Sequence, residues 1–435
     1  MNGFLTWIPH VLRFQTLDEW LSWQESLNPR EIDLGLERVS RVLHRAGHNT
    51  RFDCPLITVA GTNGKGSVVA YIEAIALAGG YTTCSYTSPH LLRYNERIRI
   101  NGGEIDDESL CAAFERIDQA RGEEQLTYFE FGTLAAIDLF MAARPDLVIM
   151  EIGLGGRLDA VNIMQPSVAV ITTIAIDHTD WLGADRETIG VEKAGILRAG
   201  CPAVCGDFDP PQSVINHAAK LAVELKLIGH DFRVEPRPET WALHVNDSSL
   251  DELPLPALAG EFQLANAATA IIALKSLHDL TTGVDAIKQG LRDVRLPGRF
   301  QVIWQQPVVI VDVAHNLQAA ESLASQLKAH DSAGRTHAVV AMLADKPVAD
   351  VIKAVSGEID DWYPAGLESV PRGLSAAHMA DAVERLASDV KLSAASTVTS
   401  ACEQALAAAA DNDRIIIFGS FYTVAEAMQF FALQS

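Results

Sequence analysis

Short apolar runs alternate along this chain with longer stretches in which apolar residues recur every three or four positions. The short runs are rich in Val, Ile and Leu and end in polar residues or glycine, which is typical of buried strands. They predict strands at Leu56–Ala60, Thr83–Tyr86, Asp146–Glu151, Ser167–Thr172, Val308–Asp312, His337–Met342 and Arg414–Phe418. The longer stretches predict helices at 65–77, 187–198, 265–280, 316–330, 376–387 and 401–410. This alternation predicts an α/β fold with a mainly parallel sheet.

The pattern restarts near Leu296-Pro297-Gly298, which predicts two domains. Residues 1–296 are expected to form the larger one, and residues 297–435 a smaller, Rossmann-like α/β domain. Between 229 and 258 the sequence is richer in proline, aspartate and short alternating runs, which predicts a small β excursion. A cleft between the two domains is the expected place for a ligand.

The composition favours a packed protein of the cytoplasm. Hydrophobic residues make up 48% of the 435 positions, so the chain can bury large cores. The formal net charge of −22 argues against nucleic acid or an anionic membrane as a partner. No run of eighteen apolar residues occurs, and the first residues lack the basic and apolar regions of a secretory signal. Six cysteines without CxxC spacing indicate buried, reduced thiols.

The most informative stretch follows the first predicted strand and reads GTNGKGS (61–67). Gly61, Gly64 and Gly66 leave room for backbone N–H groups to surround an anion at the start of a helix. Lys65 adds a positive charge for the outer phosphates, and the Ser67 hydroxyl is suited to Mg²⁺. A glycine-rich turn without a ligand is the alternative, and it would not need the lysine and the hydroxyl. The larger domain is therefore predicted to be P-loop-containing, with a mainly parallel sheet, and to bind a nucleotide.

Polar residues also follow the next predicted strands, at the edge where open α/β sheets bind ligands. Ser88 belongs to the polar connection 87–97, for which a solvated loop is the alternative. Glu151 ends a strand, and a carboxylate there is suited to Mg²⁺. His178 alone would be an ordinary loop histidine, but it follows a third strand with a polar end. Three such strand ends in succession favour a ligand site.

Two further regions carry candidate residues. Lys193 lies on a predicted helix whose other face is apolar, so the pattern favours a surface lysine paired with a nearby glutamate. In the second domain, Arg299 lies near the start, and Asp312 ends a strand shortly before His315. These three residues are candidates to reach a nucleotide from across the cleft. A carboxylate at a strand end can accept hydrogen bonds from both ribose hydroxyls.

Together these residues resemble the folylpolyglutamate synthase/dihydrofolate synthase family, a branch of the Mur ligase superfamily. The resemblance runs from about residue 21 to the C-terminus and includes IDLGLERV (32–39). The segment TYFEFGTLAA (127–136) is similar to that of bifunctional bacterial members, which also use dihydropteroate. The other motifs are GTNGKGS (61–67), TSPHLLRYNERIRING (87–102), EIGLGGRLDAVN (151–162), DHTDWLG (177–183), EKAGI (192–196), NAATA (266–270), LPGRFQ (296–301) and DVAHN (312–316).

The resemblance implies a role for each matched residue. The ATP-binding residues would be Asn63, Gly64, Lys65, Gly66, Ser67, Asn266, Arg299 and Asp312. The metal-binding residues would be Ser88, Glu151, His178 and Lys193, the last as a carbamate, which replaces the surface-lysine interpretation. The pterin-binding residues would be Thr127, Tyr128, Phe129, Glu130, Leu158, Asp159 and Ala160. The catalytic residues would be Lys65, Lys193 and His315. Segment 26–29 lies where such enzymes add contacts, but its letters match poorly and it stays unassigned.

The implied activity is that of an ADP-forming ligase that adds L-glutamate to dihydropteroate, giving dihydrofolate, and to tetrahydrofolate, giving polyglutamates. A substrate carboxylate would attack ATP to form an acyl phosphate, while Lys65 and two Mg²⁺ ions neutralise charge. Residues 1–296 would be the ATP-binding domain and 297–435 the glutamate ligase domain of a monomer. The expected partners are small molecules: ATP, L-glutamate, dihydropteroate and reduced folates. Anionic substrates are expected to meet a group of local cations, namely Arg93, Arg97, Arg99 and Arg157.

Three alternatives remain at this stage. A monofunctional folylpolyglutamate synthase would extend folates but ignore dihydropteroate, and a Mur-type peptide ligase would share the phosphate loop. A P-loop switch protein would hydrolyse a nucleotide without any acceptor. Three positions depart from the family pattern. Ser67 stands where threonine is common, Phe262 where histidine is frequent and Leu317 where proline is common.

Overall fold

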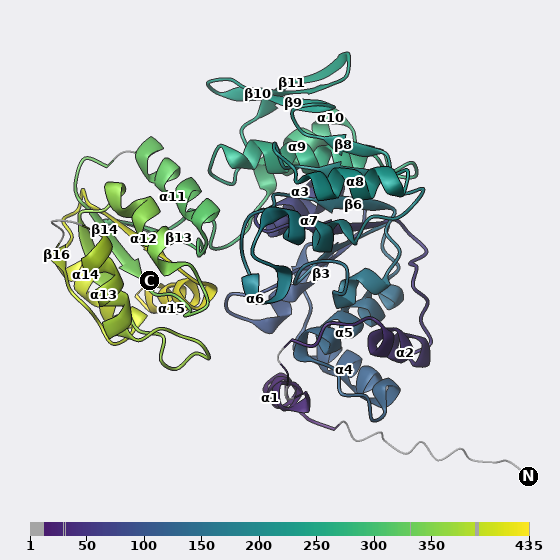
Figure 1. Cartoon of the computed structure of the whole chain (residues 1–435), viewed down its shortest axis with the longest axis horizontal. Coiled ribbons are helices and arrows are strands. Elements are labelled where there is room, and N and C mark those ends of the chain that lie inside the picture. Colours follow the sequence, from purple (N-terminus) through teal and green to yellow (C-terminus); the bar gives the residue numbers. More distant parts are fainter. Residues whose placement is uncertain (1–12, 29, 31, 331, 388–390, 435) are drawn as a thin grey trace, which may run out of the picture.

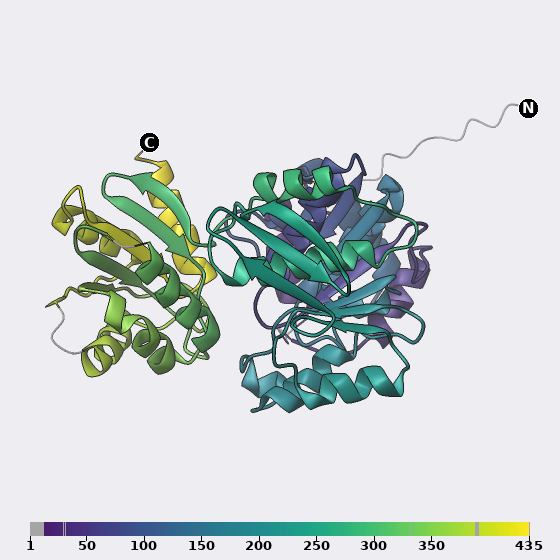
Figure 2. The same ribbon diagram turned by 90° about the horizontal axis from the view of Figure 1, so that it is seen from above.

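The structure is a computed structural model that describes residues 13–28, 30, 32–330, 332–387 and 391–434. The segment 1–12, where no secretory signal is expected, lies outside these ranges, as does Pro29. Two α/β bodies lie side by side, and the smaller one is formed by the C-terminal third of the chain (Figures 1 and 2). The predicted fold class is confirmed.

The larger body is built on an eight-stranded sheet with the order β4-β3-β2-β5-β1-β6-β7-β8. Six strands are parallel, while β3 and β4 form an antiparallel edge. Four predicted strands lie at the centre of this sheet, two of them with the predicted bounds. The strands are β1 Leu56–Ala60, β2 Thr83–Tyr86, β3 Ile98–Ile100, β4 Gly103–Glu104, β5 Leu147–Glu151, β6 Val168–Ile171, β7 Ala203–Cys205 and β8 Leu225–Leu227.

Both faces of this sheet are buried, because successive side chains of each strand enter different cores. Ile57 and Val59 of β1 belong to one core and Leu56 and Ala60 to the other. This explains why β1 is apolar throughout instead of alternating. The helices on the first face are α3 Lys65–Ala78, α9 Phe262–Lys275 and α10 Val284–Asp293. Those on the second face are α1 Leu17–Leu27, α2 Glu37–Arg45, α4 Asp107–Arg121, α5 Tyr128–Ala143, α7 Arg186–Ala194 and α8 Gln212–Lys220.

The predicted β excursion is a three-stranded antiparallel sheet that covers the outside of α9 and α10 (Figure 1). Its strands are β9 Phe232–Pro236, β10 Thr240–Val245 and β11 Ser248–Pro254. Trp241 is fully buried beneath it and its indole N–H donates to the Pro254 carbonyl at 2.9 Å. Short elements complete this body: α6 Thr179–Leu182 and the 3₁₀ turns η1 Tyr94–Arg97 and η2 Ala160–Ile163.

The smaller body holds a six-stranded sheet with the order β12-β13-β17-β14-β15-β16, parallel except for β12. Its strands are β12 Gln301–Gln305, β13 Val308–Asp312, β14 Thr336–Val340, β15 Asp361–Pro364, β16 Lys391–Leu392 and β17 Arg414–Phe418. Its helices are α11 Leu317–Ala329, α12 Val348–Val355, α13 Ala376–Leu386, α14 Val398–Ala408 and α15 Phe421–Ala432, with the 3₁₀ turn η3 Ser356–Glu358.

No helix in the described ranges is long and apolar enough to cross a membrane. The six cysteines are all free, and four of them are buried, while Cys54 and Cys201 are partly accessible.

Candidate active site

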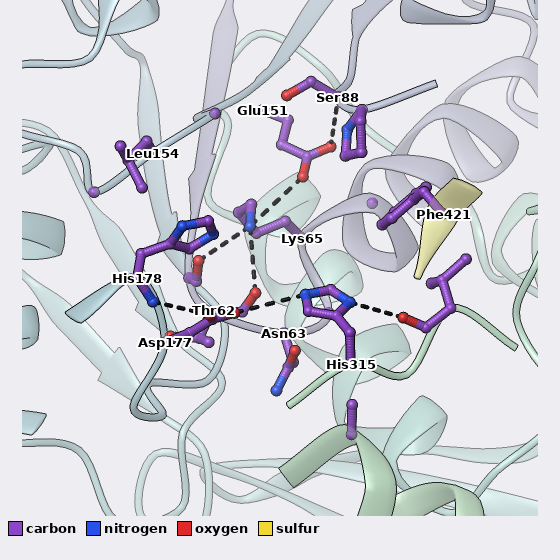
Figure 3. Close-up of a pocket in the computed structure, with 18 of the residues that line it drawn as sticks. Thr62, Asn63, Lys65, Ser88, Glu151, Leu154, Asp177, His178, His315 and Phe421 are labelled. Carbon is purple, nitrogen blue, oxygen red and sulfur yellow. Dashed lines mark hydrogen bonds and ion pairs between the residues drawn. The ribbon is translucent and has the colours of Figure 1, made fainter. Parts of the chain in front are cut away.

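A cavity of about 1230 Å³ lies between the two bodies and opens at the carboxyl ends of the central strands. Its walls come from the loops after β1, β2, β5 and β6 on one side and from the loop after β13 on the other. Every residue that the sequence assigned to ATP, metal or pterin binding or to catalysis lines it. The structure therefore brings the predicted phosphate, metal and acceptor residues into one space. Figure 3 shows some of the predicted phosphate and metal residues in this space, among them Asn63, Lys65 and Glu151.

The phosphate loop turns from β1 into α3 with two glycines at positive φ, +152° at Gly61 and +87° at Gly64. A Cβ at Gly61 would lie 1.7 Å from Thr172 Oγ1, and one at Gly64 would lie 2.6 Å from Asn266 Oδ1. Only glycine fits both places. Lys65 is the first residue of α3, so the free N–H groups of that helix face the cavity beside its ammonium.

Lys65 lies among oxygen atoms (Figure 3). Its Nζ donates to the carbonyls of Gly61 at 3.2 Å and Thr62 at 3.3 Å, and it lies 3.8 Å from Glu151 Oε1. Glu151 is buried at the end of β5, and its Oε2 accepts from the Ser88 backbone N–H at 3.4 Å. Burial raises the pKa of Glu151, and the charge of Lys65 opposes that rise.

The loop after β6 presents Asp177 and His178 to the smaller body. Burial lowers the pKa of His178 to about 4, so its imidazole is neutral and can ligate a metal. Asp177 lies 2.7 Å from Lys346 Nζ and 3.6 Å from His315 Nε2. Burial disfavours its charge, but the His315 hydrogen bond and the charge of Lys346 lower the pKa of Asp177 below its usual range. Asp177 thus ties the two bodies together, and neither it nor Lys346 was assigned a role from sequence.

Lys193 is buried on α7, with 3% of its surface exposed, so the surface-lysine interpretation is wrong. Its ammonium has no hydrogen bond or ion pair with any residue that the structure describes. Burial, followed by the charge of Lys65, lowers the pKa of Lys193 to about 7. The neutral amine is therefore far more accessible near pH 7 than in an exposed lysine. Within the described ranges, no three His, Cys, Asp or Glu side chains are grouped closely enough to hold a metal by themselves.

The end of the cavity where the sequence predicts the acceptor residues, which we call the acceptor end, is built by the N-terminus of α5. Thr127 and Glu130 form a capping box in which the Glu130 N–H donates to Thr127 Oγ1 and the Thr127 N–H to Glu130 Oε2. Arg38 Nε donates to both Glu130 oxygens, at 3.0 and 2.9 Å, and Arg38 also pairs with Asp33. Tyr128 and Phe129 are thereby held at the cavity wall.

Asp159 lies across from these residues, in the turn that precedes η2. Its carboxylate accepts from the backbone N–H groups of Leu154 and Val161, both at 2.9 Å. Burial raises the pKa of Asp159 to about 7, and these hydrogen bonds lower it in part. Leu158 and Ala160 line the cavity on either side.

Some residues of the cavity lining were not singled out from the sequence, and some expectations were wrong. Arg30, Ile32, Asp33 and Leu34 line the cavity, whereas the described part of segment 26–29 does not. The sequence feature that could have indicated these residues is IDLGL (32–36), in which a carboxylate lies between apolar residues just before a helix. Of the four arginines expected around the substrates, Arg97 lines the cavity. The other three are not in its lining and form ion pairs instead: Arg93 with Asp107, Arg99 with Glu73 and Arg157 with Glu192.

The smaller body contributes the residues predicted to meet a nucleotide. Asp312 accepts from the backbone N–H groups of Phe300 and Ala314, both at 2.8 Å, and burial raises its pKa. Arg299 lies with its guanidinium 5.4 Å from the centre of the Phe421 ring, and burial lowers its pKa. His315 Nδ1 donates a hydrogen bond to the Val313 carbonyl at 2.8 Å.

The phosphate loop itself contacts the smaller body. Asn63 Nδ2 donates to Gln318 Oε1 at 2.7 Å and to Asn316 Oδ1 at 3.1 Å, and Asn316 Nδ2 donates back to Asn63 Oδ1 at 3.0 Å. Nothing in the local sequence indicates these contacts, because their partners are more than 250 residues apart.

Comparisons with known proteins agree with this arrangement. The Mur ligase middle domain matches residues 59–274, and the Mur ligase, glutamate ligase domain matches residues 298–421. The dihydrofolate synthase/folylpolyglutamate synthase of Escherichia coli (strain K12) is 44% identical over 414 residues, which are 95% of each chain.

Two solved structures are similar over nearly the whole chain. E. coli FolC in complex with DHPP and ADP has a TM-score of 0.91 and 43% identity, covering 97% of this chain and 98% of that one. A bifunctional folylpolyglutamate synthase/dihydrofolate synthase with Mn, AMPPNP and L-glutamate bound has a TM-score of 0.88 and 44% identity, with the same coverage. The chain therefore belongs to the dihydrofolate synthase/folylpolyglutamate synthase family of Mur ligases.

Proposed function

We propose that this protein is an ATP-dependent, ADP-forming ligase that adds L-glutamate to dihydropteroate and to tetrahydrofolate. The observation that carries the proposal is the single cavity that joins the phosphate loop to the acceptor segments 127–130 and 158–160. The relatives named above are bifunctional in both steps, and structures of two of them hold ADP or an ATP analogue.

In the first step, a carboxylate oxygen of the acceptor attacks the γ-phosphorus of ATP, and ADP leaves. This forms an acyl phosphate, which is needed because a carboxylate is a poor electrophile. Lys65, Asn63 and the N-terminus of α3 hold the phosphates, and Arg299 faces them from the other body. The catalysis is mainly positioning and neutralisation of charge.

In the second step, the amine of glutamate attacks the acyl carbonyl, and phosphate leaves with one former carboxylate oxygen. The amine must first lose a proton. His315 is our candidate for the group that accepts it, because its Nδ1 hydrogen is held by Val313 and its Nε2 faces Asp177 at 3.6 Å. The carboxylate of Asp177 stabilises the imidazolium that results.

The residues present fit two magnesium ions. Ser88 and Glu151 offer oxygen ligands beside the phosphates, and His178 offers a neutral nitrogen. Bound there, the ions would neutralise charge on the transferring phosphoryl group. A carbamate on Lys193 would supply the missing acidic ligand. Its buried amine, with a pKa of about 7, is neutral often enough to react with CO₂.

The organisation of the chain follows from the same proposal. Residues 1–296 form the ATP-binding domain, and residues 297–435 form the glutamate ligase domain, which brings His315 and Arg299 to the nucleotide. Because both domains contribute to one cavity within a single chain, a monomer is sufficient for activity. The free cysteines favour the cytoplasm, where thiols stay reduced.

A coupled assay of ADP release tests the proposal. The protein is given ATP, Mg²⁺, bicarbonate and L-glutamate, with dihydropteroate and tetrahydrofolate as acceptors in turn. We expect ADP release with either acceptor and none without glutamate. Release with tetrahydrofolate alone would identify a monofunctional folylpolyglutamate synthase. Release with neither acceptor present would instead indicate a nucleotide hydrolase, and release with a UDP-muramyl acceptor a cell-wall ligase.

A further inference from the structure

The phosphate loop is fixed by the segment that follows β6. Thr172 Oγ1 donates to the Asn63 carbonyl at 2.6 Å, and Thr173 Oγ1 lies 3.2 Å from the same oxygen. The Thr62 backbone N–H donates to the Thr173 carbonyl at 2.6 Å. The Thr62 hydroxyl donates to the Ala175 carbonyl and accepts from the Ala175 N–H, both at 3.1 Å. The shape of the loop therefore depends on residues that are distant in the sequence.

Of the two threonine hydroxyls, that of Thr172 bonds to the loop alone. Thr172 is 1% exposed and is not in the cavity lining, and its Oγ1 has no other partner among the described residues. Thr173 lines the cavity, and its single hydroxyl proton can go either to the Asn63 carbonyl or to Gln318 Oε1, both at 3.2 Å. A Cβ on Gly61 would lie 1.7 Å from Thr172 Oγ1. The Thr172 hydroxyl thus occupies the space that glycine leaves inside the loop.

The bond to the Asn63 carbonyl fixes the direction of the next backbone N–H. The Asn63–Gly64 peptide bond is trans, and in a trans peptide the C=O and the following N–H point in opposite directions. Because the carbonyl points to Thr172, the Gly64 N–H points away from the end of β6. Gly64 lines the cavity, and its N–H has no acceptor among the described residues. It precedes Lys65 at the start of α3, where free N–H groups bind anions.

We propose that Thr172 is a positioning residue, whose hydroxyl holds the Asn63 carbonyl so that the Gly64 N–H is directed at the β-phosphate of the nucleotide. The β-phosphate is the group concerned because the neighbouring Lys65 reaches the β- and γ-phosphates. Without the Thr172 hydrogen bond the peptide can flip, since glycine at 64 tolerates either orientation. The flipped peptide would present a carbonyl oxygen to the phosphate and weaken its binding. This inference rests on the proposed placement of the phosphates at residues 61–67.

Nucleotides with and without a β-phosphate test the inference. We would measure the affinities for ADP and AMP by calorimetry without an acceptor. Thr172→Val removes the hydroxyl but keeps the shape of the side chain, and Thr172→Ser keeps the hydroxyl. Thr58→Val is the matched control. Thr58 is equally buried in the adjacent strand β1, and its hydroxyl has no hydrogen-bond partner among the described residues.

Thr172→Val is expected to weaken ADP binding about 10-fold or more, as for the loss of a hydrogen bond to a charged group, while AMP binding stays within about twofold of wild type. Thr172→Ser and Thr58→Val should keep the wild-type preference for ADP over AMP. A preference that Thr172→Val leaves within about twofold of wild type would overturn the inference, because a merely structural loss weakens both nucleotides alike.

A second measurement uses the wild type and does not depend on the folding of a variant. In a crystal structure with ADP, we expect the Gly64 N–H to donate to a β-phosphate oxygen while the Asn63 carbonyl accepts from Thr172. A Gly64 nitrogen more than about 3.5 Å from every β-phosphate oxygen would overturn the inference. A wild type that binds ADP no more tightly than AMP would contradict the proposed phosphate site itself, and with it the proposed function.

Discussion

The two ends of the cavity differ in how their buried charges are paired. At the acceptor end, Glu130 takes hydrogen bonds from Arg38 and from the Thr127 N–H, and Asp159 takes two from backbone N–H groups. At the phosphate end, Lys193 has no partner among the described residues, and Lys65 is 3.8 Å from Glu151. Protein groups alone complete the first end. At the second end the buried Lys193 amine has no hydrogen bond or ion pair with a described residue, so it is available to a ligand.

This difference separates two ways of preparing a site. Burying an unpaired charge costs several kcal/mol. An unpaired buried charge is therefore expected mainly where it binds a ligand. Under the proposed function, the acceptor end is organised before the pterin binds, because Glu130 and Asp159 are already hydrogen-bonded within the protein. At the phosphate end, the cost of the unpaired buried charge would be relieved only when the nucleotide and the metal ions bind. Substitutions at the two ends should therefore fail in different ways.

The largest effect is expected for Lys65→Ala at the phosphate end. Loss of its charge from the transferring phosphoryl group should lower ADP release at saturating substrates by at least about 100-fold. Folding should change little, because Lys65 makes only two carbonyl contacts and one long ion pair. Lys220→Ala, an exposed lysine on α8, is the control. Turnover near the wild-type value in Lys65→Ala would contradict the proposed role.

A smaller loss is expected for Lys193→Ala. If a carbamate on this residue completes the metal site, its removal should cost about 10- to 100-fold in activity and in metal affinity. Metal affinity can be followed by calorimetry with Mn²⁺, with and without bicarbonate. The wild type should bind more tightly with bicarbonate, and the variant should not respond to it. A crystal structure that shows both metals beside an unmodified Lys193 amine would remove the carbamate.

At the acceptor end, Arg38→Met should act on stability and on one KM only. Removal of Arg38 leaves the buried Glu130 without its cation and with only the Thr127 N–H as a partner, which should lower the free energy of unfolding by about 3 kcal/mol. The KM for dihydropteroate should rise about 10-fold while that for ATP stays unchanged. Arg41→Met is the matched control. Arg41 lies on α2 like Arg38, but its ion pair with Glu124 is at the protein surface. Equal increases in both KM values would show that the two ends are not separate.

The smallest effect concerns pH. Burial raises the pKa of Asp159 to about 7, so the carboxylate form falls from most molecules at pH 8 to a minority at pH 6. A pterin that donates hydrogen bonds needs the carboxylate. The KM for dihydropteroate should therefore rise about 5- to 10-fold from pH 8 to pH 6. Asp159→Asn should remove this dependence, and a slope that survives in that variant would assign it to another group.

Local pattern was sufficient for much of this structure. β1 and β13 lie at the predicted residues because each is an unbroken apolar run between polar residues. β15 was missed, since Asp361 begins it and Pro364 ends it, and both residues are typical of turns. Helix α7 ends at Ala194, before the predicted Arg198, because Gly195 follows it.

The candidate site was predicted where motifs carry it and missed where contacts are distant. Periodicity placed Lys193 on a helix but could not show that its side chain is buried and lines the cavity. The Asp177–Lys346 pair joins residues 169 positions apart, and no local rule connects them. Asp33 was overlooked although IDLGLERV was noted, because its pairing with Arg38, which also binds the distant Glu130, appears only in the folded chain.

The central claim is that ATP activates the acceptor carboxylate as an acyl phosphate. Dihydropteroate labelled with oxygen-18 in its carboxylate tests this directly, with the released phosphate analysed by mass spectrometry. If the carboxylate attacks ATP, each amide formed should transfer one labelled oxygen to phosphate. Formation of the amide with only unlabelled phosphate would contradict the account.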